Sequence, residues 1–251
     1  MKIIQVTPEN VEETGLMCVK NKKAPGYKAK VSWFRDKLNE GLKMQTAFDE
    51  NGKEVAFIEY IPSEKAWRPV KAGNYMFIHC IGVFSKDLRN NQLGSKLIKK
   101  CEEDAKAEKK NGVCVMTSDG VWMADSSLFI KNGYRSAGEH GRFQLMVKKF
   151  KEEAPDPEFF DWTHKQYDYQ GWNLIYSDQC PWHHKSAVEL KKAAESYGID
   201  LKVRKLKTPE EAQSAPSGFG TFSLLYDGKL LEDHYLSRRR FQNILNEKLN
   251  F

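Results

Sequence analysis

The stretch from Tyr75 to Lys110 constrains the fold most, because it predicts a strand, a polar loop and a helix in direct succession. Residues 75–84 are largely apolar and rich in β-favouring side chains, which is typical of a buried strand. Residues 85–92 are mostly polar and predict a loop. Apolar side chains then recur at helical spacing: Leu93, Leu97, Ile98, Cys101 and Ala105. Such an arrangement predicts an anion site, because the first N–H groups of a helix lack partners.

The loop sequence Arg89-Asn-Asn-Gln-Leu-Gly94-Ser95 resembles the acyl-CoA signature of the GCN5-related N-acetyltransferases (the GNAT family), Arg/Gln-x-x-Gly-x-Gly/Ala. In that family the loop follows a strand that ends in apolar-x-Val, here Ile81-Gly-Val83. The resemblance implies that loop amides hold the pyrophosphate of acetyl-CoA and that the strand binds its pantetheine and acyl group. The cofactor-binding residues it implies are Ile81, Val83, Arg89, Asn90, Asn91, Gln92, Leu93, Gly94 and Ser95.

Three positions depart from the family pattern. Gln92 stands where the first glycine belongs, which a backbone-amide site tolerates if the residue is not at positive φ. The segment Phe129-Ile-Lys-Asn-Gly133-Tyr134 is similar to the family's aromatic-Tyr-x-Lys-x-Gly-Phe, but Phe129 replaces the tyrosine that usually acts as general acid. Trp122 occupies a position where many members carry an asparagine facing the cofactor.

The resemblance covers residues 1–150, for which we expect an α/β (α+β) domain with a mixed sheet. The predicted order is a strand, two helices divided by a turn at Gly26-Tyr27, a hairpin, the central strand–loop–helix stretch, a strand, a short helix and a last strand. The predicted strands are residues 2–7, 44–48, 54–61, 75–84, 112–117 and 143–147. This order agrees with the topology of the acetyltransferase fold.

Residues 151–171 begin with charges and prolines and predict a linker, followed by a smaller domain over residues 172–251. Its predicted order, strand–helix–strand–helix–strand–strand–helix, resembles a thioredoxin-like fold. It also resembles the YoaP-like domain that follows the acetyltransferase domain in some bacterial proteins. Cys180-Pro-Trp-His183 stands at the place of Cys-Pro-x-Cys, and Pro216 at the place of the cis-proline. Because the second cysteine is missing, we expect no disulfide cycling within this domain.

Histidine 79 is the first candidate for catalysis. Strand alternation predicts that His79 and Ile81 share one face, and the resemblance implies that the backbone at Ile81 bonds the acyl carbonyl. An imidazole there can take the proton of the attacking amine; the alternative is a histidine packed and hydrogen-bonded within the sheet. Glu59, on the preceding hairpin strand, is a second candidate base or else a solvent-facing carboxylate. Trp67 and Arg68 could line an acceptor site or cover the core.

Cys180 is the third catalytic candidate. It precedes Pro181 at the predicted start of a helix, where the dipole lowers the pKa of a thiol. A reactive thiol is one reading and an inert remnant of a redox fold is the other. Cys180 and His183 have the spacing of metal ligands, but no second pair completes a tetrahedral set, so we expect no metal.

The composition of the chain bears on its ligands and on its cellular compartment. Forty basic and thirty-four acidic residues give a net charge of +6, and the two signs interleave. This favours attraction to phosphate-bearing ligands, without a nucleic-acid motif. No apolar run is long enough to span a membrane. The five cysteines are an odd number without a predicted signal peptide, so we expect reduced thiols in the cytoplasm.

Together these features predict an enzyme that transfers an acetyl group from acetyl-CoA to a primary amine by direct attack in a ternary complex. The expected partners are acetyl-CoA and a small amine or peptide, without nucleic acid or membrane. Two alternatives stay open. One is an acyl-CoA sensor without turnover, which Gln92 and Phe129 favour. The other is a thiol-handling or redox protein centred on Cys180.

Overall fold

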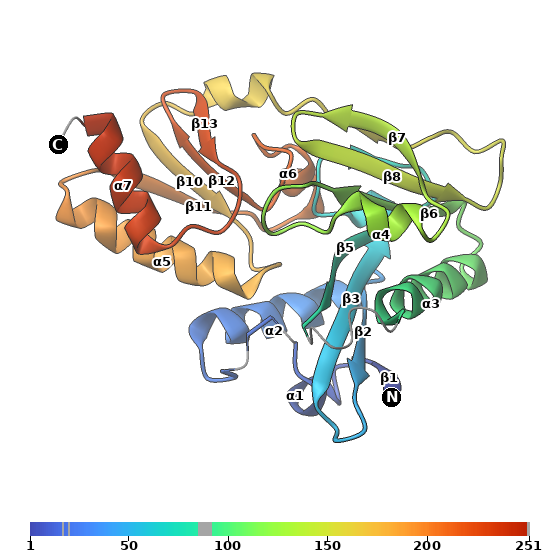
Figure 1. Ribbon diagram of the computed structural model, residues 1–251. Coiled ribbons are helices and arrows are strands. Elements are labelled where there is room, and N and C mark those ends of the chain that lie inside the picture. Colours follow the sequence, from blue (N-terminus) through green and yellow to red (C-terminus); the bar gives the residue numbers. More distant parts are fainter. Residues whose placement is uncertain (17, 20, 85–91, 250–251) are drawn as a thin grey trace. The chain divides into compact units, whose positions relative to one another are not determined.

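The computed structural model describes residues 1–16, 18–19, 21–84 and 92–249, which form two compact units (Figure 1). Unit 1 takes in residues 1–20, 34–66 and 70–160. Unit 2 takes in residues 21–33, 67–69 and 161–251. The predicted limits of 1–150 and 172–251 are contiguous in sequence, whereas unit 2 also contains two short segments from the amino-terminal part of the chain.

Unit 1 is built on a seven-stranded mixed sheet in the order β1-β2-β3-β5-β6-β8-β7. Its strands are β1 (Lys2–Gln5), β2 (Lys43–Phe48), β3 (Glu54–Pro62), β5 (Met76–Val83), β6 (Gly112–Thr117), β7 (Arg135–His140) and β8 (Phe143–Lys149). All neighbouring strands are antiparallel except β5 and β6, which are parallel. The short strands β4 (Val70–Lys71) and β9 (Glu158–Phe159) pair with each other. The predicted mixed-sheet α/β class is confirmed.

The helices of unit 1 cover this sheet. They are α1 (Val11–Thr14), α3 (Leu93–Ala107) and α4 (Ser126–Ile130), while α2 (Pro25–Leu38) contributes residues to both units. The apolar face of α3 is buried in a core cluster with side chains of β3, β5 and β6. This is the packing expected of a helix whose apolar residues recur at positions i, i+4 and i+5. The strand, loop and helix of the central stretch are therefore arranged as predicted.

Unit 2 contains a four-stranded sheet in the order β11-β10-β12-β13. Its elements are β10 (Trp172–Tyr176), α5 (Pro181–Ser196), β11 (Leu201–Lys205), α6 (Pro209–Gln213), β12 (Phe222–Tyr226), β13 (Lys229–Glu232) and α7 (Arg238–Leu249). Strand β10 is parallel to β11 and antiparallel to β12. The succession of strands and helices is the predicted one. Every peptide bond of the described residues is trans, so the expectation of a cis-proline at Pro216 is wrong.

None of the helices in the described residues combines the length and the apolar character needed to cross a membrane.

Candidate active site

The central strands β5 and β6 part from each other halfway along their length. They pair at three positions, Met76–Val113, Phe77–Cys114 and Ile78–Val115. Strand β5 then continues to Val83, still paired with β3 on its other side. Within the described residues, the edge of β5 from position 79 to 83 therefore has no ladder partner on the β6 side. Such an edge offers N–H and C=O groups to an extended ligand, and Ile81 and Val83 both lie on it.

A β-bulge interrupts the β3–β5 ladder where the strands part. Glu59 faces Cys80 and Tyr60 faces Ile78, so His79 is the extra residue of β5. The bulge shifts the alternation of side chains by one position. Ile81 packs against the same core cluster as Ile78, whereas the ring of His79 lies 5.7 Å from that of Phe77. The prediction that His79 and Ile81 share a face is therefore wrong.

The same bulge brings the two predicted bases together. Nδ1 of His79 lies 3.3 Å from Oε1 of Glu59, and the side chains are 0% and 2% exposed. The alternative of a solvent-facing Glu59 is thus wrong. A carboxylate beside an imidazole fixes the orientation of the ring and stabilises its protonated form. Nδ1 is therefore the ring nitrogen that faces the carboxylate of Glu59.

The predicted anion site at the start of α3 is described only in part. Arg89, Asn90 and Asn91 lie outside the described residues. Gln92 caps the helix with φ 56° and ψ 16°, in the left-handed region. A backbone-amide site accepts glutamine at this position only if its φ is not positive. The observed φ of Gln92 does not meet this condition. A left-handed conformation costs a residue with a Cβ about 1–2 kcal/mol, and glycine takes it most readily.

The first turn of α3 is fixed against α4. Leu93 and Gly94 are buried, and a Cβ added to Gly94 would lie 3.2 Å from Cδ1 of Leu128. Oγ of Ser95 accepts a hydrogen bond of 3.0 Å from Nδ2 of Asn132. Helix packing therefore favours glycine at position 94, whatever its role toward a ligand, because a Cβ there would require Leu128 to shift.

The position of the missing general acid is apolar. Phe129 is fully buried, and its ring centroid lies 5.4 Å from that of Tyr134 in an edge-to-face contact. Tyr134 is itself 4% exposed, and burial raises its pKa well above the usual value. Neither residue supplies an exposed acid.

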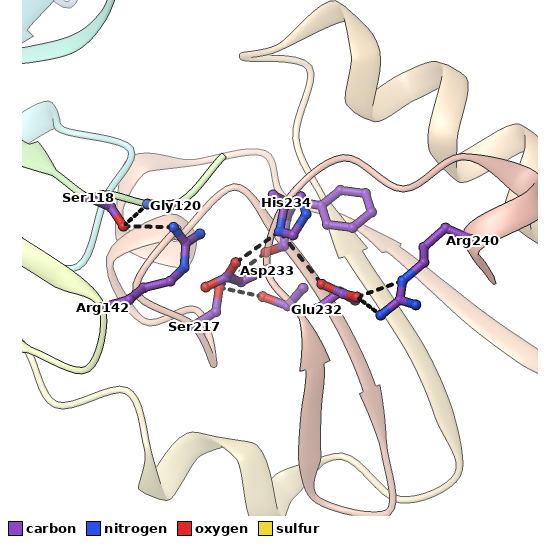
Figure 2. Close-up of polar contacts among 10 residues, drawn as sticks. Ser118, Gly120, Arg142, Ser217, Glu232, Asp233, His234 and Arg240 are labelled. Atoms are coloured by element: carbon purple, nitrogen blue, oxygen red, sulfur yellow. Dashed lines mark hydrogen bonds and ion pairs between the residues drawn. The ribbon is translucent and has the colours of Figure 1, made fainter. Parts of the chain in front are cut away.

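The loop that follows β6 is held by Arg142 (Figure 2). Oγ of Ser118 accepts hydrogen bonds from Nη1 of Arg142 at 2.9 Å and from the main-chain N–H of Gly120 at 3.1 Å. The guanidinium also lies 4.4 Å from the ring centroid of Phe143. In the same loop Trp122 takes a φ of 69° and is 47% exposed. This loop follows the end of β6 that is not paired with β5, and Trp122 lies in it.

Cys180 occupies the predicted position, but its burial works against the predicted activation of the thiol. It caps α5, with Pro181 as the first helical residue. Burial raises the pKa of the thiol above its ordinary value, although main-chain N–H groups and the charges of Lys30 and Arg68 act in the opposite direction. The start of the helix does act to lower the pKa, as expected from the sequence, but burial outweighs it and the net direction is upward. Sequence reasoning did not anticipate Lys30 and Arg68 here, because they come from distant segments of the chain.

Within the described residues, 1–16, 18–19, 21–84 and 92–249, no group of three or more His, Cys, Asp or Glu side chains could hold a metal ion.

The chain is similar to a family model, to a protein of known sequence and to solved structures. A family model described as YoaP-like matches residues 200–243. The protein named "Uncharacterized N-acetyltransferase YoaP" from Bacillus subtilis (strain 168) is 28% identical over 252 residues, which cover 98% of this chain and 99% of that protein. The structure of aminoglycoside 6'-acetyltransferase type Ii is 18% identical with a TM-score of 0.47, over 59% of this chain and 97% of that chain. The structure of aminoglycoside 6'-N-acetyltransferase complexed with coenzyme A is 15% identical with a TM-score of 0.43, over 62% of this chain and 100% of that chain.

Proposed function

Because this chain is a YoaP-like relative of the GNAT acetyltransferases, we propose that it transfers an acetyl group from acetyl-CoA to a primary amine. The similarity to a protein named as an N-acetyltransferase extends over both units and confirms the predicted family. The observation that carries the proposal is the parting of β5 from β6, with the His79–Glu59 pair at the bulge where it begins.

Acetyl-CoA is the co-substrate in this proposal. The open edge of β5 at positions 79–83 supports binding of its pantetheine, because an extended amide chain can pair there as a further strand would. The start of α3 supports binding of the pyrophosphate, because the first N–H groups of a helix attract anions. We assign Arg89, Asn90 and Asn91 to the same pyrophosphate site from the sequence signature.

His79 serves as general base, with Glu59 as its positioning residue. The neutral amine attacks the carbonyl carbon of the thioester, and its nitrogen must give up a proton as the C–N bond forms. Since the ring of His79 is buried, we propose that this proton reaches the imidazole through one bound water. The C–N bond forms, the C–S bond breaks, and CoA leaves as a thiolate. The carboxylate of Glu59 stabilises the resulting imidazolium.

A sensor that binds acyl-CoA without turnover is the second candidate. The observation that favours it is the buried phenyl ring of Phe129 at the place of the family's acid. The thiol-handling alternative loses support, because burial raises the pKa of Cys180. For the setting we propose the cytoplasm, since all five cysteines are free thiols, as a reducing compartment requires.

The test is release of free CoA from acetyl-CoA, measured against a panel of amines by the wild-type protein and by His79→Gln. Turnover of at least one amine, lost in the variant, supports the enzyme. Acetyl-CoA binding in calorimetry without CoA release on any amine supports the sensor. The absence of any acetyl-CoA binding overturns both.

A further inference from the structure

The first turn of α5 is enclosed by distant segments that belong to unit 2. A Cβ on Gly26 would overlap the carbonyl oxygen of Pro181. In the same unit, a Cβ on Gly220 would lie 3.1 Å from Cα of Arg68. Glycine at both positions lets these backbones approach closely. Lys30 and Arg68, from the segments 21–33 and 67–69, both act electrostatically on the thiol of Cys180.

Two buried cations come from these segments. Lys30 is 4% exposed and Arg68 is 3% exposed. Nζ of Lys30 lies 4.1 Å from the ring centroid of Trp33. The guanidinium of Arg68 lies 4.7 Å from the ring of Phe219, and its Nη1 donates to Oγ1 of Thr221 at 3.1 Å. These contacts hold the positive charges in place, and a buried charge attracts a counter-charge strongly because water does not screen it.

His183 adds a buried hydrogen-bonding group. Its side chain is enclosed by Phe219 and Phe222, with ring centroids 5.7 and 5.2 Å away, and the residue is 1% exposed. Its Nδ1 has no hydrogen-bond partner among the described residues. Burial, together with the charges of Arg68 and Lys30, lowers the pKa of His183 to about 3, so the ring is neutral near pH 7.

The protonation state of this ring decides what it can bind. The ring also hydrogen-bonds to the main chain of Ser177, an interaction that favours a proton on the ring. With that proton on Nε2, Nδ1 is left as an acceptor. A buried acceptor is normally satisfied, so Nδ1 points to a bound group that carries a donor.

We propose that the first turn of α5, with Lys30, Arg68 and His183, binds a small protonated oxyanion, such as hydrogen phosphate, beside the thiol of Cys180. The two cations and the helix N-terminus attract its negative charge, and Nδ1 of His183 accepts its O–H. This site is separate from acetyl transfer and does not depend on the proposed enzyme activity.

Alkylation of Cys180 in the full chain tests the site. Iodoacetate and iodoacetamide react with thiolates by the same displacement of iodide but differ in charge, and peptide mass spectrometry reports each cysteine separately. We expect the rate ratio of iodoacetate to iodoacetamide to be about tenfold higher at Cys180 than at Cys18, which is also partly exposed. Equal ratios overturn the proposal, and so does the absence of labelling by either reagent.

Inorganic phosphate provides the second arm. Millimolar phosphate should slow alkylation of Cys180 severalfold and leave Cys18 unchanged. Acetate at the same concentration and ionic strength has no O–H to donate near pH 7 and should protect less. Equal protection by the two anions, or none, overturns the assignment of a protonated oxyanion.

Matched variants distinguish the effect of losing a charge or a hydrogen-bonding group from the effect of disturbing the fold. Lys30→Met should lower the rate ratio at Cys180 several-fold, whereas Lys30→Arg keeps the charge and should retain it. His183→Phe preserves the aromatic packing and should lose protection by phosphate while keeping the high rate ratio. Unchanged phosphate protection in His183→Phe contradicts the role of Nδ1.

Discussion

Nδ1 of His79 lies 3.3 Å from Oε1 of Glu59, and both side chains are buried at the bulge where β5 begins to part from β6. An isolated buried carboxylate is costly, and a histidine beside it offsets that cost. The pair therefore has a structural effect as well as the proposed catalytic one. Variants that keep the size and hydrogen bonding of each side chain are needed to separate the two.

His79→Gln should reduce kcat about a hundredfold, because glutamine keeps a hydrogen-bonding group near Glu59 but cannot accept a proton. The affinity for acetyl-CoA, measured by calorimetry, should stay unchanged. His164→Gln is the matched control, since its side chain is 60% exposed in unit 2. If His79→Gln kept the full rate, the general base would be another residue.

Glu59→Gln should lower kcat about tenfold with little change in KM, because the amide no longer stabilises the imidazolium. Glu59→Asp retains the charge and should recover part of the rate. Steady-state kinetics of the three proteins measure this split. An equal loss in Glu59→Gln and Glu59→Asp would indicate a packing role without a charge effect.

Gln92→Gly should stabilise the protein by up to about 1 kcal/mol, because glycine takes the left-handed conformation without strain. Part of the gain is offset by the greater freedom of glycine in the unfolded chain. Urea unfolding measures the difference. Gln92→Ala, which keeps the Cβ, is the control and should show no gain; equal stability of all three proteins would argue against strain at this position.

Gly94→Ala should destabilise the protein by about 1–3 kcal/mol, because its Cβ meets Leu128 at 3.2 Å. Combining it with Leu128→Ala should recover part of this loss, and a double-mutant cycle measures the coupling. Acetyl-CoA binding by the double variant then reports the effect on the cofactor alone. Additive losses in the cycle would contradict the packing argument.

The stability of the protein should fall with acid through His183. Its pKa is lowered to about 3 in the folded protein, mainly by burial, from 6.5. The unfolded chain therefore binds a proton at this residue between pH 6.5 and 3, whereas the folded protein does not. The free energy of unfolding should drop by about 1.4 kcal/mol per pH unit in that window. His183→Phe should flatten this slope in urea titrations at several pH values; an unchanged slope would exclude His183 as its source.

The order of elements follows from the sequence because it depends on local periodicity. The central strand and helix are clear from their apolar patterns. The turn expected at Gly26-Tyr27 is instead inside α2, where Pro25 begins the helix and fixes its first residue. Strand β7 was missed, because its residues are mostly polar and lie at an edge of the sheet, where one-sided burial leaves little apolar alternation.

The site could be predicted only in outline. His79 and Glu59 were both candidates from the sequence, but one extra residue in β5 determines that they meet. A bulge depends on how two strands pair, and no residue in β5 marks it. The environment of Cys180 was likewise hidden, because the burial that raises its pKa and the cations near it depend on segments far away in the chain.

The assignment of residues 21–33 and 67–69 to unit 2 has a genetic consequence. Cleavage or gene fission within residues 151–171 would leave Lys30 and Arg68 on one polypeptide and Cys180 on the other. Recombination that exchanged only the carboxyl-terminal part would likewise pair its helix α5 with foreign segments. A division of the chain within residues 151–171 would therefore also divide unit 2, although the residues form two compact units.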